Sequence, residues 1–115
     1  MDGHDPMTEG ASPPPAASHL HQPVRLQLMA LLLQRGDVGF AAACRAIGTT
    51  PGNLDGHARR LEQQGYLVSR RELLRTGFAT RYRITPEGSA ALESYLRWLD
   101  GVGRSARAAG GGDSA

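Results

Sequence analysis

The sequence of 115 residues predicts a mainly α-helical domain that carries one β-hairpin, in the order helix, short helix, helix, strand, strand, helix. Three observations lead to this fold class. Apolar residues recur at helical spacing in four segments between Pro23 and Asp100. Two short segments with alternating side chains, residues 66–70 and 81–84, are typical of paired strands. Two pairs that commonly begin helices, Thr50-Pro51 and Thr85-Pro86, stand ahead of the third and last helical segments.

The first helix is expected over Pro23–Arg35, because proline is favourable in a first turn. Its apolar residues form two stripes: Val24, Leu28, Leu31 and Leu32, and then Leu26, Met29 and Leu33. A helix that is apolar on two sides is usually buried on two sides. We therefore expect one side to face the core of the domain and the other to face another helix or a second subunit.

Two helices follow a break at Gly36-Asp37. The first is short, over Phe40–Ile47, and ends at Gly48, since glycine is the usual residue just past a helix C-terminus. The second is expected to run from Pro51, with Thr50 as its N-cap, to Gln64 and to stop at Gly65. Because only residues 48–50 separate them, these helices have the spacing of a helix-turn-helix unit.

The hairpin is expected from the strands Tyr66–Arg70 and Arg81–Ile84, with Thr76-Gly77 as the turn. Alternation in the second strand places Arg81 and Arg83 on one face and Tyr82 and Ile84 on the other. A basic face would therefore back onto the core. Leu73, Leu74 and Phe78 are unusual near a solvated tip and are expected to pack on the domain or on a partner subunit.

The last helix is expected to begin after Thr85-Pro86 and to end near Asp100, with Leu92, Leu96 and Leu99 along one face. Composition sets the domain boundaries. Residues 1–18, which contain three consecutive prolines, are expected to form a disordered tail. Residues 19–102 form the domain, and the Gly/Ala/Ser-rich residues 103–115 are expected to form a flexible tail.

The basic residues are unevenly distributed along a chain whose formal net charge is only +2. All thirteen are arginines, and only Glu62 and Glu72 oppose those between positions 59 and 83. Such a block favours a polyanionic partner, and a solvated arginine-rich surface is the alternative. The arginines of this block are Arg59, Arg60, Arg70, Arg71, Arg75, Arg81 and Arg83.

The outward side of the third helix carries residue types that suit contact with DNA. Gly52 and Gly56 would let DNA come close to the backbone, and the helix N-terminus attracts a phosphate. Asn53 can pair with an adenine edge, whereas Arg59 and Arg60 can pair with guanine or with phosphate. The candidate DNA-binding residues are therefore Thr50, Gly52, Asn53, Gly56, His57, Arg59 and Arg60 on the helix, and Arg70, Arg71, Arg75, Arg81 and Arg83 on the hairpin.

Several short runs in a fixed order strengthen this interpretation. They are His21-Gln22-Pro23-Val24-Arg25-Leu26, Gly52-Asn53-Leu54 with His57 and Arg60-Leu61-Glu62, Gly65-Tyr66-Leu67, and Tyr82-Arg83-Ile84-Thr85-Pro86-Glu87-Gly88. Over roughly residues 19–100 this order resembles the short winged-helix transcriptional regulators of the MarR/ArsR-like superfamily. The resemblance implies a winged helix-turn-helix fold (α-α-α-β-β-α), a double-stranded DNA partner, and a homodimer on a near-palindromic operator.

The implied homodimer would be built largely by the first and last helices. The candidate dimer residues are Leu26, Met29 and Leu33 on the first helix and Tyr95, Trp98 and Leu99 on the last. Two departures limit what the resemblance implies. The Cys or His clusters of metal-sensing relatives are not found here, and relatives with long C-terminal dimerisation helices have more chain than this one. The resemblance therefore identifies no inducer.

Other chemistry finds little support in the sequence. Cys44 lies at a core-like position and is expected to be structural rather than a redox sensor. His19 and His21 have no thiolate or carboxylate nearby, so no metal site is expected. No Ser/His/Asp set, phosphate-binding glycine loop or carboxylate pair indicates an enzyme or a cofactor.

Cellular location and mode of action follow as expectations. A single cysteine suits the reducing cytoplasm, and no apolar stretch reaches the roughly 18 residues of a membrane-spanning helix. Two alternatives to a plain DNA-binding regulator stay open. One is a winged-helix module that binds protein. The other is a regulator whose DNA binding is gated by an unidentified small-molecule effector at the dimer seam.

Overall fold

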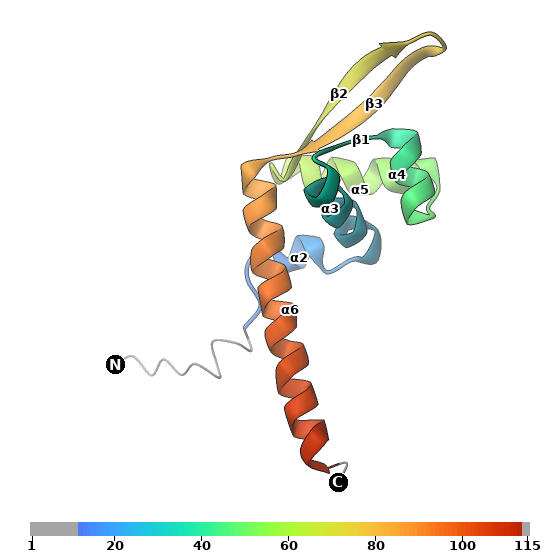
Figure 1. Cartoon of the computed structure of the whole chain (residues 1–115). Coiled ribbons are helices and arrows are strands. Elements are labelled where there is room, and N and C mark those ends of the chain that lie inside the picture. The colour runs from blue at the N-terminus through green and yellow to red at the C-terminus, as the bar shows by residue number, and fades with distance from the viewer. Residues whose placement is uncertain (1–11, 114–115) are drawn as a thin grey trace.

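Helix α3, Pro23–Arg35, lies at the centre of the computed structural model, which describes residues 12–113 (Figure 1). Its bounds are those predicted. The side chain of Gln22 accepts a hydrogen bond from the backbone N–H of Arg25 at 2.8 Å and begins the helix. Gly36, at φ +82°, ends it. Helices α2, α4, α5 and α6 and strands β1 and β3 all contact α3, so both sides of the helix are used largely within one chain.

The helix-turn-helix unit consists of α4, Phe40–Ile47, and α5, Pro51–Gln63. Both match the predicted helices to within a residue. Gly48 adopts a left-handed conformation at φ +77°, which lets the chain turn sharply between them. The buried stripe Leu54, Ala58 and Leu61 then holds α5 against the core.

A three-stranded antiparallel sheet replaces the predicted two-stranded hairpin. The additional strand, β1, covers Asp37–Gly39 and pairs with β3, so that the strand order is β1-β3-β2. Three residues are too few for an alternating pattern to stand out, so periodicity did not predict this strand. Its central residue, Val38, lies opposite Tyr82 and is buried with it in the core.

The hairpin is longer than predicted. Strand β2 covers Leu67–Leu74 and β3 covers Gly77–Ile84. Because Leu74 pairs with Gly77, the turn consists of Arg75 and Thr76, and the prediction of Thr76-Gly77 is wrong by one residue. The outer half of the hairpin extends beyond the core and is held by main-chain pairing. Its side chains therefore do not alternate between buried and exposed as those at the base of the hairpin do.

Helix α6, Pro86–Asp113, continues well past the expected end near Asp100. The predicted flexible tail over residues 103–115 is therefore helical as far as Asp113. Glycines at positions 101, 103 and 110–112 led to the earlier end, since glycine costs about 1 kcal/mol relative to alanine inside a helix. The C-terminal part of α6 runs away from the rest of the domain (Figure 1).

The predicted disordered tail over residues 1–18 also needs correction where the structure describes it. Residues 1–11 lie outside the described residues. Helix α2, Ala17–Leu20, is only four residues long, yet Ala16, Ala17 and Leu20 belong to the buried core. Contacts of α2 with α3 and α6 explain why this segment is ordered.

Candidate nucleic-acid interface

The N-terminal end of α5 is organised by two threonines. The hydroxyl of Thr50 accepts a hydrogen bond from the backbone N–H of Asn53 at 3.2 Å, which confirms Thr50 as the N-cap. The side-chain amide of Asn53 donates to the hydroxyl of Thr49 at 2.8 Å. Pro51 has no N–H, and the N–H groups of Asn53 and Leu54 are bonded to Thr50. Because Thr50 and Asn53 are exposed, the first turn of α5 presents the oriented amide of Asn53 and the positive end of the helix dipole to solvent.

Gly52 and Gly56 lie on the exposed side of the same helix. A Cβ atom built at either position would have no heavy atom within 4 Å. The packing of the chain itself therefore does not require glycine at these two positions, although each glycine weakens the helix. Glycine at these two positions leaves the backbone of α5 accessible to the close approach of a partner.

The arginines of α5 differ in their surroundings. Arg59 donates from Nε to Asp55 at 2.9 Å, an exposed pair one turn apart. Arg60 is exposed. Burial lowers the pKa of the Arg25 guanidinium on α3, and the nearby charge of Arg60 lowers it further. Arg60 is therefore part of a group of positive charges, whereas Arg59 is partly neutralised.

His57 joins that group at the side of α5 that faces α3. Its Nδ1 lies 3.0 Å from a guanidinium nitrogen of Arg25, and because arginine can only donate, Nδ1 is the acceptor. Burial lowers the pKa of His57, and the charges of Arg25 and Arg60 lower it further. Arg25 also donates to the backbone carbonyl of His19 at 2.6 Å, so this arginine fixes α2, α3 and α5 relative to one another.

Three hairpin arginines converge on Asp37 of β1. Arg81 donates from Nε to this carboxylate at 2.6 Å, Arg70 donates at 3.1 Å and Arg83 at 3.4 Å. Arg81 also lies 3.7 Å from Glu72. These arginines share one face of the hairpin and are gathered by an acid that lies outside the predicted hairpin.

Asp37 makes the stability of the fold sensitive to acid. The hydrogen bond from Arg81 is the largest cause that lowers the pKa of Asp37, and the charges of Arg70 and Arg81 add to it, while burial opposes them. Because the pKa in the folded state lies below the unfolded value of about 3.9, this contribution is present above about pH 4 and is lost as the pH falls through the folded value.

We expect Asp37→Asn to remove this part of the acid sensitivity, measured as the urea midpoint at pH 7 and at pH 3. The variant should be less stable than the native chain at pH 7, and the difference should shrink at pH 3. Asp100→Asn, which removes an exposed carboxylate from α6, is the control. An unchanged difference between native chain and Asp37→Asn at the two pH values would contradict the expectation.

The opposite face of the hairpin turns toward α5. A hollow of about 250 Å³ lies between them, lined by Asp55, Ala58, Arg59 and Glu62 of α5 and by Ser69, Thr80 and Tyr82 of the strands. Ser69 donates from its hydroxyl to Glu62 at 3.1 Å and ties the strand to the helix. Tyr82 is one of the lining residues, and burial raises the pKa of its hydroxyl to about 12.

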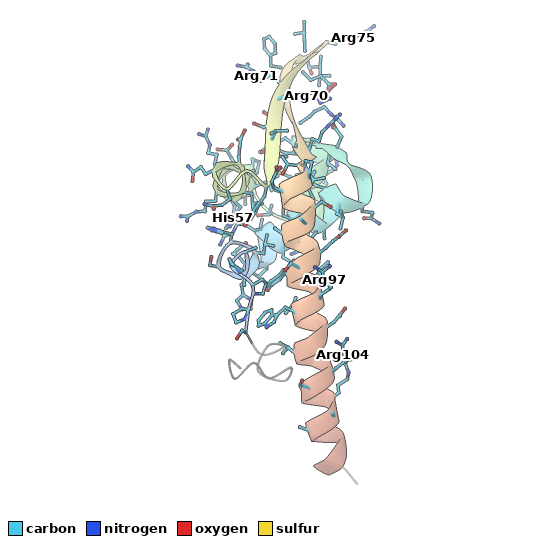
Figure 2. The ribbon with its side chains drawn as sticks, turned by 90° about the vertical axis from the view of Figure 1, so that its left-hand side faces the viewer. His57, Arg70, Arg71, Arg75, Arg97 and Arg104 are labelled. Atoms are coloured by element: carbon cyan, nitrogen blue, oxygen red, sulfur yellow. The ribbon has the colours of Figure 1, made fainter. Side chains whose placement is uncertain are left out.

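Arg71 and Arg75 occupy the outer part of the hairpin (Figure 2). The guanidinium of Arg71 lies 4.4 Å from the centre of the Phe78 ring. Arg75 is exposed in the two-residue turn. The five predicted hairpin arginines are therefore split: Arg70, Arg81 and Arg83 gather on Asp37, whereas Arg71 lies on the face that turns toward α5.

The predicted dimer residues also divide into two groups. Met29 and Tyr95 are buried in the core of their own chain, so their assignment to a dimer seam is wrong. Tyr95 is held there by a 2.7 Å hydrogen bond between its hydroxyl and Nδ1 of His21. The other four stay partly or fully accessible: Leu26, Trp98 and Leu99 are half-buried, and Leu33 is exposed.

Two residues of this region were not among the predicted site residues. Asp37 was seen only as a helix-breaking neighbour of Gly36, and Arg25 only as part of a short run. The signal for Asp37 is weak, because Asp55 and Glu62 lie nearer to the basic hairpin in the sequence and only the pairing of β1 with β3 selects Asp37. No sequence signal identifies the pairing of Arg25 with His57, since it depends on how α3 crosses α5.

The remaining candidate residues, His19, His21 and Cys44, have the following surroundings in the part of the chain that the structure describes. No group of three potential metal ligands occurs there. His19 and His21 pack their rings against Tyr66 and Tyr95, and Cys44 is a half-buried free thiol. Among these residues, no helix is long and apolar enough to cross a membrane.

Known proteins share this arrangement. A family described as "winged helix DNA-binding domain" matches residues 24–102. A transcriptional regulator homologue from Pyrococcus horikoshii OT3 is 31% identical, with a TM-score of 0.73 over 77% of this chain and 88% of that one. An uncharacterized protein of Methanocaldococcus jannaschii is 27% identical over 64% of this chain and 79% of its own length. A MarR family regulator from Silicibacter pomeroyi, 16% identical, shares the fold, with a TM-score of 0.59 over 78% of this chain and 61% of that one.

Proposed function

This chain belongs to the winged helix DNA-binding domain family, and from this premise we propose that it is a homodimeric transcriptional regulator of the cytoplasm that binds specific sites on double-stranded DNA. Helix α5 would enter the major groove by its N-terminal part, as the second helix of such a unit does. The hairpin, now called the wing (residues 67–84), would lie along the backbone or in the adjacent minor groove.

The observation that carries this proposal is the exposed surface at the start of α5. It combines an N-terminal helix end, which attracts phosphate, with two glycines that internal packing does not require. Asn53 adds an amide that is suited to an adenine edge. Arg60 adds positive charge farther along the helix, and Arg75 does so at the end of the wing.

Duplex titration at 50 mM and 200 mM salt tests the proposal, with a duplex pool enriched by the native chain from random sequence. Neutralising phosphates releases counterions, so affinity should fall steeply with salt. We expect Arg60→Ala and Arg75→Ala each to weaken binding by roughly threefold to tenfold at the lower salt, if each loses one phosphate or base contact. Both variants should keep the oligomeric state of the native chain.

Arg104→Ala is the matched control, because Arg104 is an exposed arginine of α6 far from the wing (Figure 2). It should bind DNA as the native chain does. If the native chain binds no duplex even at 50 mM salt, the proposal fails and a protein-binding module becomes the better account. If Arg60→Ala and Arg75→Ala bind as tightly as the control, the DNA-facing surface is wrongly placed.

The homodimer rests on α6. Its apolar stripe begins with Leu92 and Tyr95, which are buried in the core, and continues at spacings of four and three residues with Leu99 and Val102. Val102 is 40% exposed, and the adjoining Leu96 is 37% exposed. A helix end that leaves its domain and contains several glycines is marginal alone in water, so a second copy of α6 would cover this stripe.

A further inference from the structure

The end of the wing carries an exposed apolar pair. Leu73 and Phe78 are direct cross-strand partners at the last pair but one before the turn. Their exposed fractions, 72% and 64%, exceed those of the other exposed large apolar residues in the part of the chain that the structure describes. Neither packs on its own domain, contrary to one expectation from the sequence. Such side chains at the end of two paired eight-residue strands indicate a surface that is covered by a partner.

The strand register decides which way this pair faces. Side chains two residues apart point to the same face of a strand. Phe78 is therefore on the face of Thr80 and Tyr82, and Leu73 on that of Ser69 and Arg71. This is the face that bounds the hollow against α5. The pair lies on the α5 side of the wing, about 13 Å beyond Tyr82 at ~3.3 Å per residue.

Positive charge surrounds the pair. Arg71 lies over the Phe78 ring on the same face, and Arg75 follows in the turn. Glu72 is the one acid between positions 67 and 84, and it faces the other way, toward Arg81. An apolar tip with two arginines beside it suits a polyanion that stacks apolar rings in its interior, as the base pairs of DNA are stacked. An acidic protein surface would match the charge but would provide no comparable slot for an aromatic ring.

We propose that Leu73 and Phe78 form a wedge that enters the minor groove next to the major groove read by α5 and partly unstacks one base step there. Apolar side chains of this kind are known to open base steps and to bend the duplex toward the major groove. Arg71 and Arg75 would contact the flanking phosphates. The inference rests on the proposed function and adds to it a bent DNA product and a contribution of base-step flexibility to site choice.

Fluorescence on a 40-base-pair duplex tests the wedge, with the duplex cloned from the pool that the native chain enriches. 2-Aminopurine placed at successive steps reports unstacking, and energy transfer between end labels reports bending. We expect Phe78→Ala to lose the 2-aminopurine signal, to reduce the bend and to weaken binding about tenfold, because the variant loses the stack of an aromatic ring on a base. Leu73→Ala should show a smaller loss in the same direction, and Phe78→Trp should retain the signal.

Leu74→Ala is the matched control, because Leu74 is an exposed leucine at the same tip on the opposite face. It should bend and bind DNA as the native chain does. The wedge is overturned if the native chain binds the duplex without unstacking any base step, or if Phe78→Ala unstacks the same step equally well. Either result would leave the proposed function intact. The wedge is also overturned if the native chain self-associates and Phe78→Ala abolishes this association without changing DNA binding. In that case Leu73 and Phe78 would contact a second copy of the chain.

Discussion

Gly88→Ala is expected to lower the free energy of unfolding by about 3 kcal/mol, at the upper end of the usual cost of overpacking. A Cβ atom on Gly88 would lie 1.9 Å from the backbone carbonyl oxygen of Tyr66. That carbonyl accepts a hydrogen bond from the N–H of Thr85 at 3.1 Å, and the Thr85 hydroxyl donates to Gly65 at 2.6 Å. The first turn of α6 therefore packs directly on the segment that joins α5 to β2, and backbone atoms would have to move to admit a methyl group.

Gly101→Ala supplies the matched comparison within α6. There the nearest heavy atom to an added Cβ lies at 3.9 Å, an ordinary contact with Arg104. Alanine should therefore stabilise the helix by roughly 0.5–1 kcal/mol. Urea unfolding followed by circular dichroism measures both changes at one protein concentration. If Gly88→Ala and Gly101→Ala shift the midpoint in the same direction, the close contact between α6 and Tyr66 is not present in the folded protein.

Leu96→Arg/Val102→Arg is expected to convert the protein to a monomer and to weaken operator binding by roughly a hundredfold or more. The two substitutions leave the helix itself intact, because the side chains of Leu96 and Val102 are exposed. They place charge on the apolar stripe that a second α6 would cover. Loss of the second reading helix removes the gain from binding two half-sites at once, which commonly amounts to 10²–10⁴. Sedimentation velocity and duplex titration measure the two effects.

The charge-matched control is Ala90→Arg/Ala108→Arg. Both alanines are exposed on α6, on the side away from the apolar stripe. This variant adds the same positive charge to the same helix and should stay dimeric with at least the native affinity. A native chain that is monomeric at micromolar concentration, or a Leu96→Arg/Val102→Arg variant that stays dimeric, would exclude α6 as the seam.

The helix-turn-helix unit could be predicted almost residue by residue, because its boundaries are set by local chemistry. Pro23, Gly48 and the Thr50-Pro51 pair act on their own backbone, and the structure confirms α3, α4 and α5 near the predicted bounds. Strand β1 depends on pairing with β3, more than forty residues later, and no local pattern records it. The far end of α6 was missed because its glycines argued locally for a stop.

The candidate site shows the same division. The outward face of α5 follows from helical periodicity, so Gly52, Asn53 and Arg60 are exposed as predicted. Side chains alternate between the two faces of a strand, and this alternation predicts the face on which each wing arginine lies. The convergence of three of these arginines on Asp37 depends on the pairing of β1 with β3. Met29 belongs to the second apolar stripe of the first helix, and Tyr95 lies beside the apolar face of the last. Only the packing of α2 and α6 around α3 shows that these two side chains are buried within their own chain.

Whether this chain is a dimeric regulator that reads specific DNA through α5 and the wing is best tested by selecting bound fragments from a random-sequence duplex library. We expect a near-palindromic motif whose half-sites lie about one helical turn apart, roughly 10 base pairs. We also expect hydroxyl-radical footprints to show protected minor-groove positions flanking each half-site. Enrichment of no motif by the native chain, or of a single unrepeated half-site, would contradict this expectation.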